Sequence, residues 1–506
     1  MILDGNGDYV PEDLEFNNAK LAAKLLDKHL YSDDKVIVHA DVDFDGLCCA
    51  YEISTYFKIR NSNKKIRQAI NAKKEHGINK KAVEYFNNKF PNKNDLVIIV
   101  DSSSNLIDYI KQINHDVLVI DHHIITSNES LYGETAGGQY VIVNCTVDGD
   151  NYTATSDMSC GMVIYEFLKY YQSTRALDDE LEKYKLYHWA VATLFTDVIN
   201  TDTKHNLYYI NKAFSDTDIE PTLDRLLTEA MGQYKRFDKS AISFKLAGYF
   251  NRAIRAGDGI QALKVIARDG SSSLHSLDKY KDIQDKMLDG IETQAVEHTS
   301  YTEVNLTETN IPESYAGLIA TKLIDTFKKT SIAYKLLDNG IAKGSFRGLC
   351  DGKLLDYRQL IENMGYYAEG HETAFGFEIP ANELYNVLTE VTHYEKDVKA
   401  PEYLMSPLAS GNCLYRISDM QKFQSDGNLY KIGLINSRIC SNNEINIICS
   451  LKEVNLIEDC GKYFKYKCCG LMCRSFEPIK SPNVTLYIEF GDTLNFYLRN
   501  KWDNIV

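Results

Sequence analysis

The chain has 506 residues, a formal net charge of −15, 44% hydrophobic residues and 25% charged residues. Its length predicts more than one domain, and its composition is typical of a globular protein. It contains no run of eighteen apolar residues, which argues against a membrane-spanning helix, and it begins with acidic positions such as Asp4 and Asp8 instead of a basic, then apolar leader. We therefore expect a cytoplasmic protein whose twelve cysteines are reduced thiols.

The first third of the chain predicts a parallel β-sheet. Apolar, β-branched runs without polar alternation are typical of strands that are covered on both faces. The runs are 36–38, 96–100, 117–120 and 140–143, and the predicted helices between or beside them are 17–30, 81–89 and 159–171. Alternating strands and helices indicate an α/β fold, and we assign this domain to residues 1–220.

The rest of the chain predicts three further parts. Residues 221–299 have a helical pattern and form a predicted connector. Residues 300–400 form a second, smaller α/β lobe, with a helix at 314–328 and a hairpin of 331–337 with 340–347. Residues 401–506 form a β-rich domain, with short alternating runs at 429–436 and 444–451.

Acidic and histidine residues follow three of the four predicted strands. The first strand runs into His39, Asp41, Asp43 and Asp45, the second ends at Asp101, and the third ends at the triplet 121–123, Asp-His-His. Ligands of open α/β sheets bind beyond the carboxyl ends of the strands, so these side chains should lie together. One acidic loop alone would be read as a solvated turn, but three neighbouring strand ends indicate a site.

The proposed site has the chemistry of a metal centre. Buried carboxylates repel one another unless cations neutralise them, and mixed histidine and carboxylate ligands suit Mn²⁺, with Mg²⁺ or Zn²⁺ as alternatives. Two such ions can activate a water molecule and hold a phosphoryl group. A further acid, Asp197, ends an apolar and predicted helical run.

These motifs resemble the DHH phosphoesterase superfamily. Asp121-His122-His123 matches the signature after which the superfamily is named, and His39-x-x-x-Asp43-x-Asp45 is similar to its first motif. The resemblance implies that two Mn²⁺ ions are bound, with Mg²⁺ as an alternative. Its implied ligands are His39, Asp43 and Asp101 for one ion, and Asp45, Asp101, His122 and Asp197 for the other. His123 would face the phosphate, and Asp41 would support the site as the extra acid of the RecJ form.

The resemblance extends to a substrate-binding set outside the metal motifs. The segment 244–255 looks like the RecJ segment that carries an Asn and an Arg to the cleft, here Asn251 and Arg255. The segments 341–347 and 369–376 look like the two motifs of the DHH-associated C-terminal domain. They imply that Ser345, Arg347, Gly370 and His371 hold the substrate backbone. The family's glycine run before the histidine is Ala368-Glu369 here, Gly348 replaces a usual Ser, and Ala253-Ile254 replaces smaller residues.

The RecJ resemblance implies a metal-dependent exonuclease that degrades single-stranded DNA from 5′ to 3′ and releases mononucleotides. In this interpretation the catalytic set is His123, Asp41 and Arg255, and the tail is an OB-like nucleic-acid-binding domain. The segment 462–467 alternates Lys with Tyr and Phe, which fits either base stacking or an amphipathic strand. The resemblance is also compatible with a single-strand-binding protein or another replication or repair protein as partner.

Two rival functions remain open at this point. The first is a phosphodiesterase of the same superfamily for short RNA or a cyclic dinucleotide, which the net charge of −15 and the altered glycine run favour. The second is a non-catalytic replication or binding subunit, which the complete set of ligand positions opposes.

Overall fold

The structure is a computed structural model, and it falls into two compact units, Met1–Tyr280 and most of the chain from Lys281 onward. It describes residues 2–3, 9–71, 75–150, 152–267, 272–289, 304–397, 444–448, 454–468, 471–480, 483–489 and 495–500, without residues 198, 200, 202, 240, 311, 328 and 349–354. Within these residues, no helix has both the length and the apolar character needed to cross a membrane.

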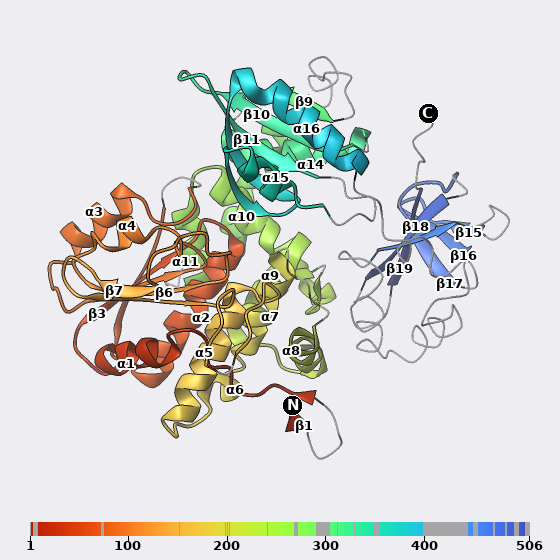
Figure 1. Cartoon of the computed structure of the whole chain (residues 1–506). Coiled ribbons are helices and arrows are strands. Elements are labelled where there is room, and N and C mark those ends of the chain that lie inside the picture. Colours follow the sequence, from red (N-terminus) through yellow and green to blue (C-terminus); the bar gives the residue numbers. More distant parts are fainter. Residues whose placement is uncertain are drawn as a thin grey trace. The chain divides into compact units, whose positions relative to one another are not determined.

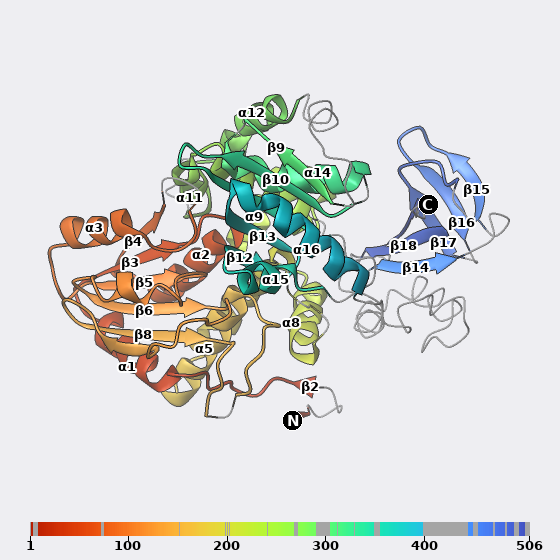
Figure 2. The ribbon, with the colours of Figure 1, turned by 45° about the horizontal axis from the view of Figure 1, so that its top comes forward.

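The first unit contains the predicted parallel sheet. Its strands lie in the order β4-β3-β5-β6-β8-β7, of which Figure 2 shows β4 to β8, and all neighbours are parallel except β7 and β8. The strands are β3 (Lys35–Ala40), β4 (Lys65–Ile70), β5 (Leu96–Val100), β6 (Asp116–Asp121), β7 (Tyr132–Glu134) and β8 (Gln139–Asn144). The four predicted strands are confirmed as β3, β5, β6 and β8.

Helices cover both faces of this sheet (Figure 1). The helical elements of the unit are α1 (Ala19–Leu30), α2 (Phe44–Arg60), α3 (Lys80–Lys89), α4 (Ile107–Ile110), α5 (Cys160–Thr174), α6 (Glu180–Lys183), α7 (Tyr187–Thr196), α8 (Lys204–Ser215), α9 (Pro221–Met231), η1 (Gly232–Tyr234), η2 (Ala241–Leu246), α10 (Ala247–Arg255), α11 (Gly259–Ala267) and η3 (Leu274–Leu277); α12 (Lys279–Leu288) spans the boundary. Val36 and Val38 pack in one core with α1, α2, α5 and α7, whereas Ile37 packs in another with α3 and α4. This two-sided burial explains why the strands show no polar alternation.

The helical segment after residue 220 packs into the first unit. Leu223 and Leu226 of α9 and Phe250 and Ile254 of α10 belong to the same core as the sheet. The first compact unit therefore does not end at residue 220. The domain boundaries at 220, 299 and 400 stay predictions.

The sequence analysis missed the two edge strands of this sheet, the three-residue β7 and the longer β4. Strand β4 lies beside β3, and its sequence Lys-Ile-Arg-Gln-Ala-Ile carries exposed Lys65 and Arg67. An edge strand with charged side chains lacks the continuous apolar run that identified the central strands. The pattern therefore identifies the buried strands and misses this exposed one.

The second unit contains two further sheets. The first has the order β12-β13-β11-β10-β9. Its elements are β9 (Asn305–Glu308), η4 (Glu313–Tyr315), α14 (Ala316–Phe327), β10 (Ser331–Leu336), β11 (Ile341–Arg347), α15 (Tyr357–Asn363), β12 (Tyr367–His371), β13 (Ala374–Pro380), η5 (Ala381–Glu383) and α16 (Leu384–Asp397). The predicted hairpin is confirmed, because β10 and β11 pair antiparallel from Ser331↔Arg347 to Leu336↔Ala342.

The C-terminal sheet has the order β14-β18-β19-β17-β16-β15. Its strands are β14 (Glu444–Ile448), β15 (Val454–Asp459), β16 (Phe464–Cys468), β17 (Leu471–Ser475), β18 (Asn483–Glu489) and β19 (Asn495–Asn500). Tyr466 of β16 is buried, and Lys465 pairs with Glu458 at 2.7 Å, which is the arrangement of an amphipathic strand. The predicted run 429–436 lies outside the described residues, and the OB-like assignment stays a prediction.

A buried charged network stabilises the first sheet. Asp116, at the start of β6, accepts hydrogen bonds from His29 Nε2 at 2.8 Å, Lys28 Nζ at 2.6 Å and the Gln139 backbone N at 2.9 Å. Burial by itself raises the pKa of the Asp116 carboxyl, but the hydrogen bonds from His29 and Lys28 outweigh it and hold this pKa well below its ordinary value. Removing the charge would leave the buried His29 ring without its charged acceptor.

We therefore expect Asp116→Asn to lower the free energy of unfolding by about 1–3 kcal/mol at neutral pH. Because the folded-state pKa lies below that of the unfolded chain, the carboxylate contributes its full stabilisation above about pH 4 and loses it as the pH falls further. The difference in the free energy of unfolding between the wild type and Asp116→Asn should shrink over that range. Urea unfolding followed by Trp189 fluorescence, in a Trp502→Phe background, measures it, and a difference that does not change with pH would contradict the explanation.

Candidate metal centre

Asp101 lies at the centre of the acidic cluster. It follows β5 directly, and its carboxylate lies among three of the four close groups of metal-ligating atoms in the described residues. One group joins it to Asp43 and Asp45, and a second joins it to His122 and His123, with all ligand atoms of each group within 4.8 Å of one another. The carboxyl ends of β3, β5 and β6 thus meet at one point, as the sequence predicted.

His122 links Asp101 to Asp197. Its Nε2 atom lies 3.3 Å from Asp101 Oδ1 and 3.1 Å from Asp197 Oδ2. Asp197 occupies the C-cap position of α7, where its backbone N donates to the Thr193 carbonyl at 3.0 Å. The tertiary fold thereby brings this distant acid to the strand ends.

The carboxyl groups of the site repel one another. Burial raises the pKa of Asp101 well above its ordinary value, and the neighbouring Asp43 and Asp197 raise it further. The pKa of Asp45 is also raised well above its ordinary value, first by burial and then by Asp43 and Asp101. Such a cluster is stable in its charged form only when cations neutralise it.

The buried Nδ1 atom of His39 makes no hydrogen bond within the described part of the chain, and neither does Oδ1 of Asp101, although His122 Nε2 lies 3.3 Å from it. Buried polar atoms are almost always hydrogen-bonded, so exceptions at a cluster of ligands indicate a missing partner. Carboxylates with imidazoles are the ligand set that suits Mn²⁺ and Mg²⁺, so the residues fit a divalent metal centre.

His39 lies at the same strand end but in none of these close groups. Its Nε2 atom contacts Asn71 Oδ1 at 3.3 Å, and its ring packs edge-on against Phe86 of α3 at 5.5 Å. Burial lowers the pKa of His39 to about 4, so the ring is neutral, which is the form that binds metal. The predicted trio of His39, Asp43 and Asp101 is therefore not within mutual contact distance here.

The signature residue Asp121 holds the loop after β6. Its Oδ1 accepts hydrogen bonds from His122 N at 2.7 Å and from the Nδ1 atom of His123 at 2.8 Å, and its Oδ2 accepts from Ser104 N at 3.0 Å. Burial by itself raises the pKa of the Asp121 carboxyl, but the adjacent His123 outweighs burial and keeps this pKa well below its ordinary value. Asp121 is thus a positioning residue for both histidines.

Asp41 has a partner that the sequence analysis missed, His76. Asp41 Oδ2 lies 2.7 Å from His76 Nδ1, and its Oδ1 accepts a hydrogen bond from Gly77 N at 3.1 Å. Burial by itself raises the pKa of the Asp41 carboxyl, but the charge of His76 outweighs burial and lowers this pKa. Because His76 is in an irregular loop after β4, no strand pattern marks it. A lone histidine so far from the first motif carries no signal in the sequence.

The backbone is strained at the centre of the site. Asp101 has φ = 66° and Ser103 has φ = 78°, a left-handed conformation that non-glycine residues rarely adopt. Each such residue costs about 1–3 kcal/mol and persists only where its surroundings hold it. Here Asp101 N donates to Ile120 O at 3.0 Å, and Ser103 Oγ accepts from Ile78 N at 3.0 Å.

Of the predicted substrate residues, Asn251 and Arg255 lie on α10 in the first unit. Asn251 Oδ1 accepts a hydrogen bond from Phe44 N at 3.2 Å, which ties α10 to the first turn of α2 beside Asp43 and Asp45. Arg255 lies one helical turn further along α10 and is partly buried. The π-helix η2 directly precedes α10, a local geometry that is frequent at functional sites.

The other predicted substrate residues lie together on the first sheet of the second unit. Ser345 and Arg347 are on β11, opposite Gly376 and Ala374 of β13, and Gly370 and His371 are on β12, opposite Phe375 and Ala374. Arg347 Nη1 donates to Ser345 Oγ at 2.7 Å. Gly370 has φ = 134°, which favours glycine at this position.

Gly46 sets the close approach of α2 to the Asp41 loop. A Cβ atom at position 46 would lie 2.7 Å from the backbone O of Asp41 and 2.9 Å from its N. Gly46 N also donates to Asp43 Oδ1 at 3.0 Å, which caps the helix that carries Asp45. Any side chain here would displace one backbone from the other.

We expect Gly46→Ala to weaken Mn²⁺ binding by about tenfold or more, since misplacing groups around a metal site has effects of this size. The clash should also cost about 1–3 kcal/mol of stability. Isothermal titration calorimetry with Mn²⁺ measures the first effect. Gly248→Ala in α10 is the matched control, because a Cβ atom there would approach nothing closer than 3.7 Å. Equal Mn²⁺ affinity in the two variants would refute the role given to Gly46.

Part of the chain is similar to a known protein family. Residues 35–193 match the model of the DHH family, N-terminal domain. A Bacillus subtilis (strain 168) protein, YorK, named as a putative SPβ-prophage-derived single-strand DNA-specific exonuclease, is 26% identical over 430 residues, which are 77% of this chain and 70% of YorK. The protein of the same name from Bacillus phage SPbeta matches equally.

Solved structures show the same fold. RecJ from Thermus thermophilus in complex with Mn²⁺ has a TM-score of 0.65 and 14% identity, and the match covers 98% of this chain and 74% of that one. An exonuclease RecJ bound to manganese has a TM-score of 0.55 and 17% identity, with 78% and 98% covered. The predicted α/β fold with further sheets in the C-terminal region is confirmed.

Proposed function

We propose that this chain, a DHH-family enzyme with the fold of RecJ, is a metal-dependent exonuclease that degrades single-stranded DNA from its 5′ end and releases mononucleotides. The observation that carries the proposal is the convergence of buried carboxylates and His122 on Asp101, where mutual repulsion calls for bound cations. The relatives named as single-strand DNA-specific exonucleases, which match 77% of this chain, support the choice of substrate.

The proposed ligands are the histidines and acids at the strand ends, together with Asp197 at the end of α7. His39, Asp43 and Asp101 would hold one divalent ion, and Asp45, Asp101, His122 and Asp197 would hold the second. The place of Asp101 between Asp43 and His122 supports its role as the shared ligand. Bound Mn²⁺ or Mg²⁺ supplies Lewis-acid activation of water and charge neutralisation at the phosphate.

Residues around the ligands orient the reacting groups. His123 is one-third exposed, and its Nδ1 atom is held by Asp121, so its Nε2 atom can face a phosphate oxygen. Although burial opposes it, the Asp121 carboxylate raises the pKa of His123 above its ordinary value, which favours a cationic donor. Asp41 holds His76, which is 43% exposed and offers a second imidazole beside Asp43.

The second unit would grip the substrate backbone. Arg347 can bind a phosphate with two parallel hydrogen bonds, and Ser345 can add a third. Gly317, in the first turn of α14, gives the Arg347 guanidinium room, because a Cβ atom there would lie 2.7 Å from Nη2. We assign Gly370 and His371 of β12, and Asn251 and Arg255 of α10, to the same task. A single-strand-binding protein or another replication or repair protein as partner stays a prediction.

The function is tested by digesting end-labelled single-stranded DNA of graded length in the presence of Mn²⁺. We expect stepwise loss of mononucleotides from the 5′ end of long strands. Asp101→Asn should lower the rate by about a thousandfold or more, because the metal ions contribute several kcal/mol of transition-state stabilisation.

Other outcomes distinguish the rival functions. Activity only on very short RNA or on a cyclic dinucleotide would replace the exonuclease with a small-substrate phosphodiesterase. Absence of metal-dependent hydrolysis on every substrate, with Mn²⁺ still bound, would indicate a non-catalytic binding subunit.

The role of Arg347 predicts a separate kinetic effect. Arg347→Ala should raise KM for single-stranded DNA by about tenfold to a hundredfold, the value of one charge-assisted phosphate contact, and should change kcat less. Lys343→Ala is the matched control, because Lys343 lies on the same face of β11 and forms an ion pair with Glu378 at 2.7 Å. Equal KM values for the two variants would remove Arg347 from the substrate site.

A further inference from the structure

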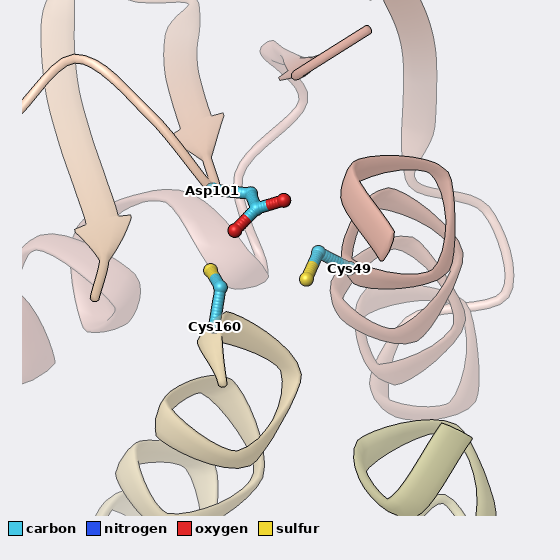
Figure 3. Close-up of side chains that lie close together, drawn as sticks. All are labelled: Cys49, Asp101 and Cys160. Atoms are coloured by element: carbon cyan, nitrogen blue, oxygen red, sulfur yellow. The ribbon is translucent and has the colours of Figure 1, made fainter. Parts of the chain in front are cut away.

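Two thiols lie directly beside the central aspartate of the metal centre. The Sγ atoms of Cys49 and Cys160 and a carboxylate oxygen of Asp101 are all within 4.8 Å of one another. Figure 3 shows that the three side chains point toward one another, from the first turns of α2, the start of α5 and the end of β5. The hydrolytic function assigns no role to either cysteine.

Both thiols are held in the protein interior. Cys49 is 0% exposed and Cys160 is 1% exposed. The Cys160 thiol donates to the Ile120 carbonyl at 3.1 Å, which fixes its side chain beside Asp101. A buried thiol is usually a small apolar side chain, but two thiols and a carboxylate that converge within ligand distance form a chelating set.

Further buried atoms around these thiols lack a hydrogen bond. Asp101 Oδ1, on a side chain that is 3% exposed, accepts none within the described residues, although His122 Nε2 lies 3.3 Å away. Glu52 lies one helical turn beyond Cys49 on α2, is 0% exposed, and neither of its carboxylate oxygens has a hydrogen-bond partner in the described part of the chain. Buried acid oxygens without such hydrogen bonds, one on Asp101 and two on Glu52 in the next turn of α2, favour a bound cation near the thiols.

We propose that Cys49, Cys160 and Asp101 form a third metal site, selective for a thiophilic divalent cation such as Zn²⁺, and that its occupancy inhibits the hydrolytic centre. Thiolates select soft or borderline ions, whereas Mn²⁺ and Mg²⁺ prefer oxygen ligands. Two cysteines and one carboxylate are three of the four ligands that a tetrahedral Zn²⁺ ion takes, and water can supply the fourth.

The inhibition follows from the shared ligand. On binding, each thiol releases its proton to the solvent and forms one sulfur–metal bond, so two protons leave for each ion bound. The Asp101 oxygen that bonds to this ion is withdrawn from the two hydrolytic ions. The inhibition, but not the binding, rests on the proposed function.

The binding is tested by titrating the full-length protein with Cd²⁺ in excess Mg²⁺ and recording the ultraviolet thiolate-to-metal charge-transfer band. We expect one equivalent of Cd²⁺ to produce the band, and Zn²⁺ to displace it. Cys49→Ser and Cys160→Ser should each weaken Cd²⁺ binding by about tenfold or more, since even changes outside the direct ligands cost about 10–100-fold.

Cys48→Ser is the matched control, because Cys48 is the adjacent buried thiol on α2 and belongs to none of the close ligand groups in the described residues. It should retain the band and the affinity of the wild type. A band that survives both Cys49→Ser and Cys160→Ser, or the absence of any band, would overturn the proposal. Circular dichroism of each variant confirms that it is folded before its binding is compared.

The inhibition is tested by hydrolysis at constant Mn²⁺ with increasing Zn²⁺, each variant being normalised to its own rate without Zn²⁺. We expect the Zn²⁺ concentration for half-inhibition to rise about tenfold or more in Cys49→Ser and Cys160→Ser, in parallel with the loss of affinity. Equal inhibition in all variants would place Zn²⁺ at the hydrolytic centre and overturn the inhibitory role. If no hydrolysis is found with any substrate, the proposed function fails, and the charge-transfer titration still decides the thiol site.

Discussion

Mutual repulsion among buried carboxylates is the constraint on which the rest of the site depends. Asp43, Asp45 and Asp101 converge from two strand ends, and burial and their neighbours raise the pKa of each carboxyl. Without cations, this arrangement favours protonation of the group or its separation. With divalent ions bound, the same charges become the ligands that hold them, so metal binding and local stability are coupled.

The surrounding residues keep the cluster together in spite of this repulsion. Asp121 fixes the two histidines of its loop, and Asp43 caps α2 through Gly46 N at 3.0 Å. The left-handed backbone of Asp101 stores strain that the hydrogen bond to Ile120 O compensates. The parallel sheet is the rigid base for all these contacts, because both its faces are buried in apolar cores.

Asp101 stands between two kinds of ligand chemistry. Toward the strand ends it is grouped with carboxylates and His122, which suit hard cations, and toward α5 it is grouped with two thiols, which suit soft ones. One carboxylate would then respond to two classes of metal. This gives a physical route by which the identity of the available ion controls the proposed hydrolysis.

The sequence alone determined the buried strands β3, β5, β6 and β8 and the acids that follow the first three of them, because continuous apolar runs and strand-end positions are local features. The edge strand β4 carries exposed charges that hide the strand pattern in its sequence, and only its pairing with β3 in the fold identifies it. The Asp41–His76 contact, the Asn251 hydrogen bond to Phe44 and the thiol pair beside Asp101 were decided only by the tertiary structure. Each of these contacts joins residues that are far apart in the chain. The packing of distant elements brings them within bonding distance, and local spacing in the sequence does not show which side chains will meet.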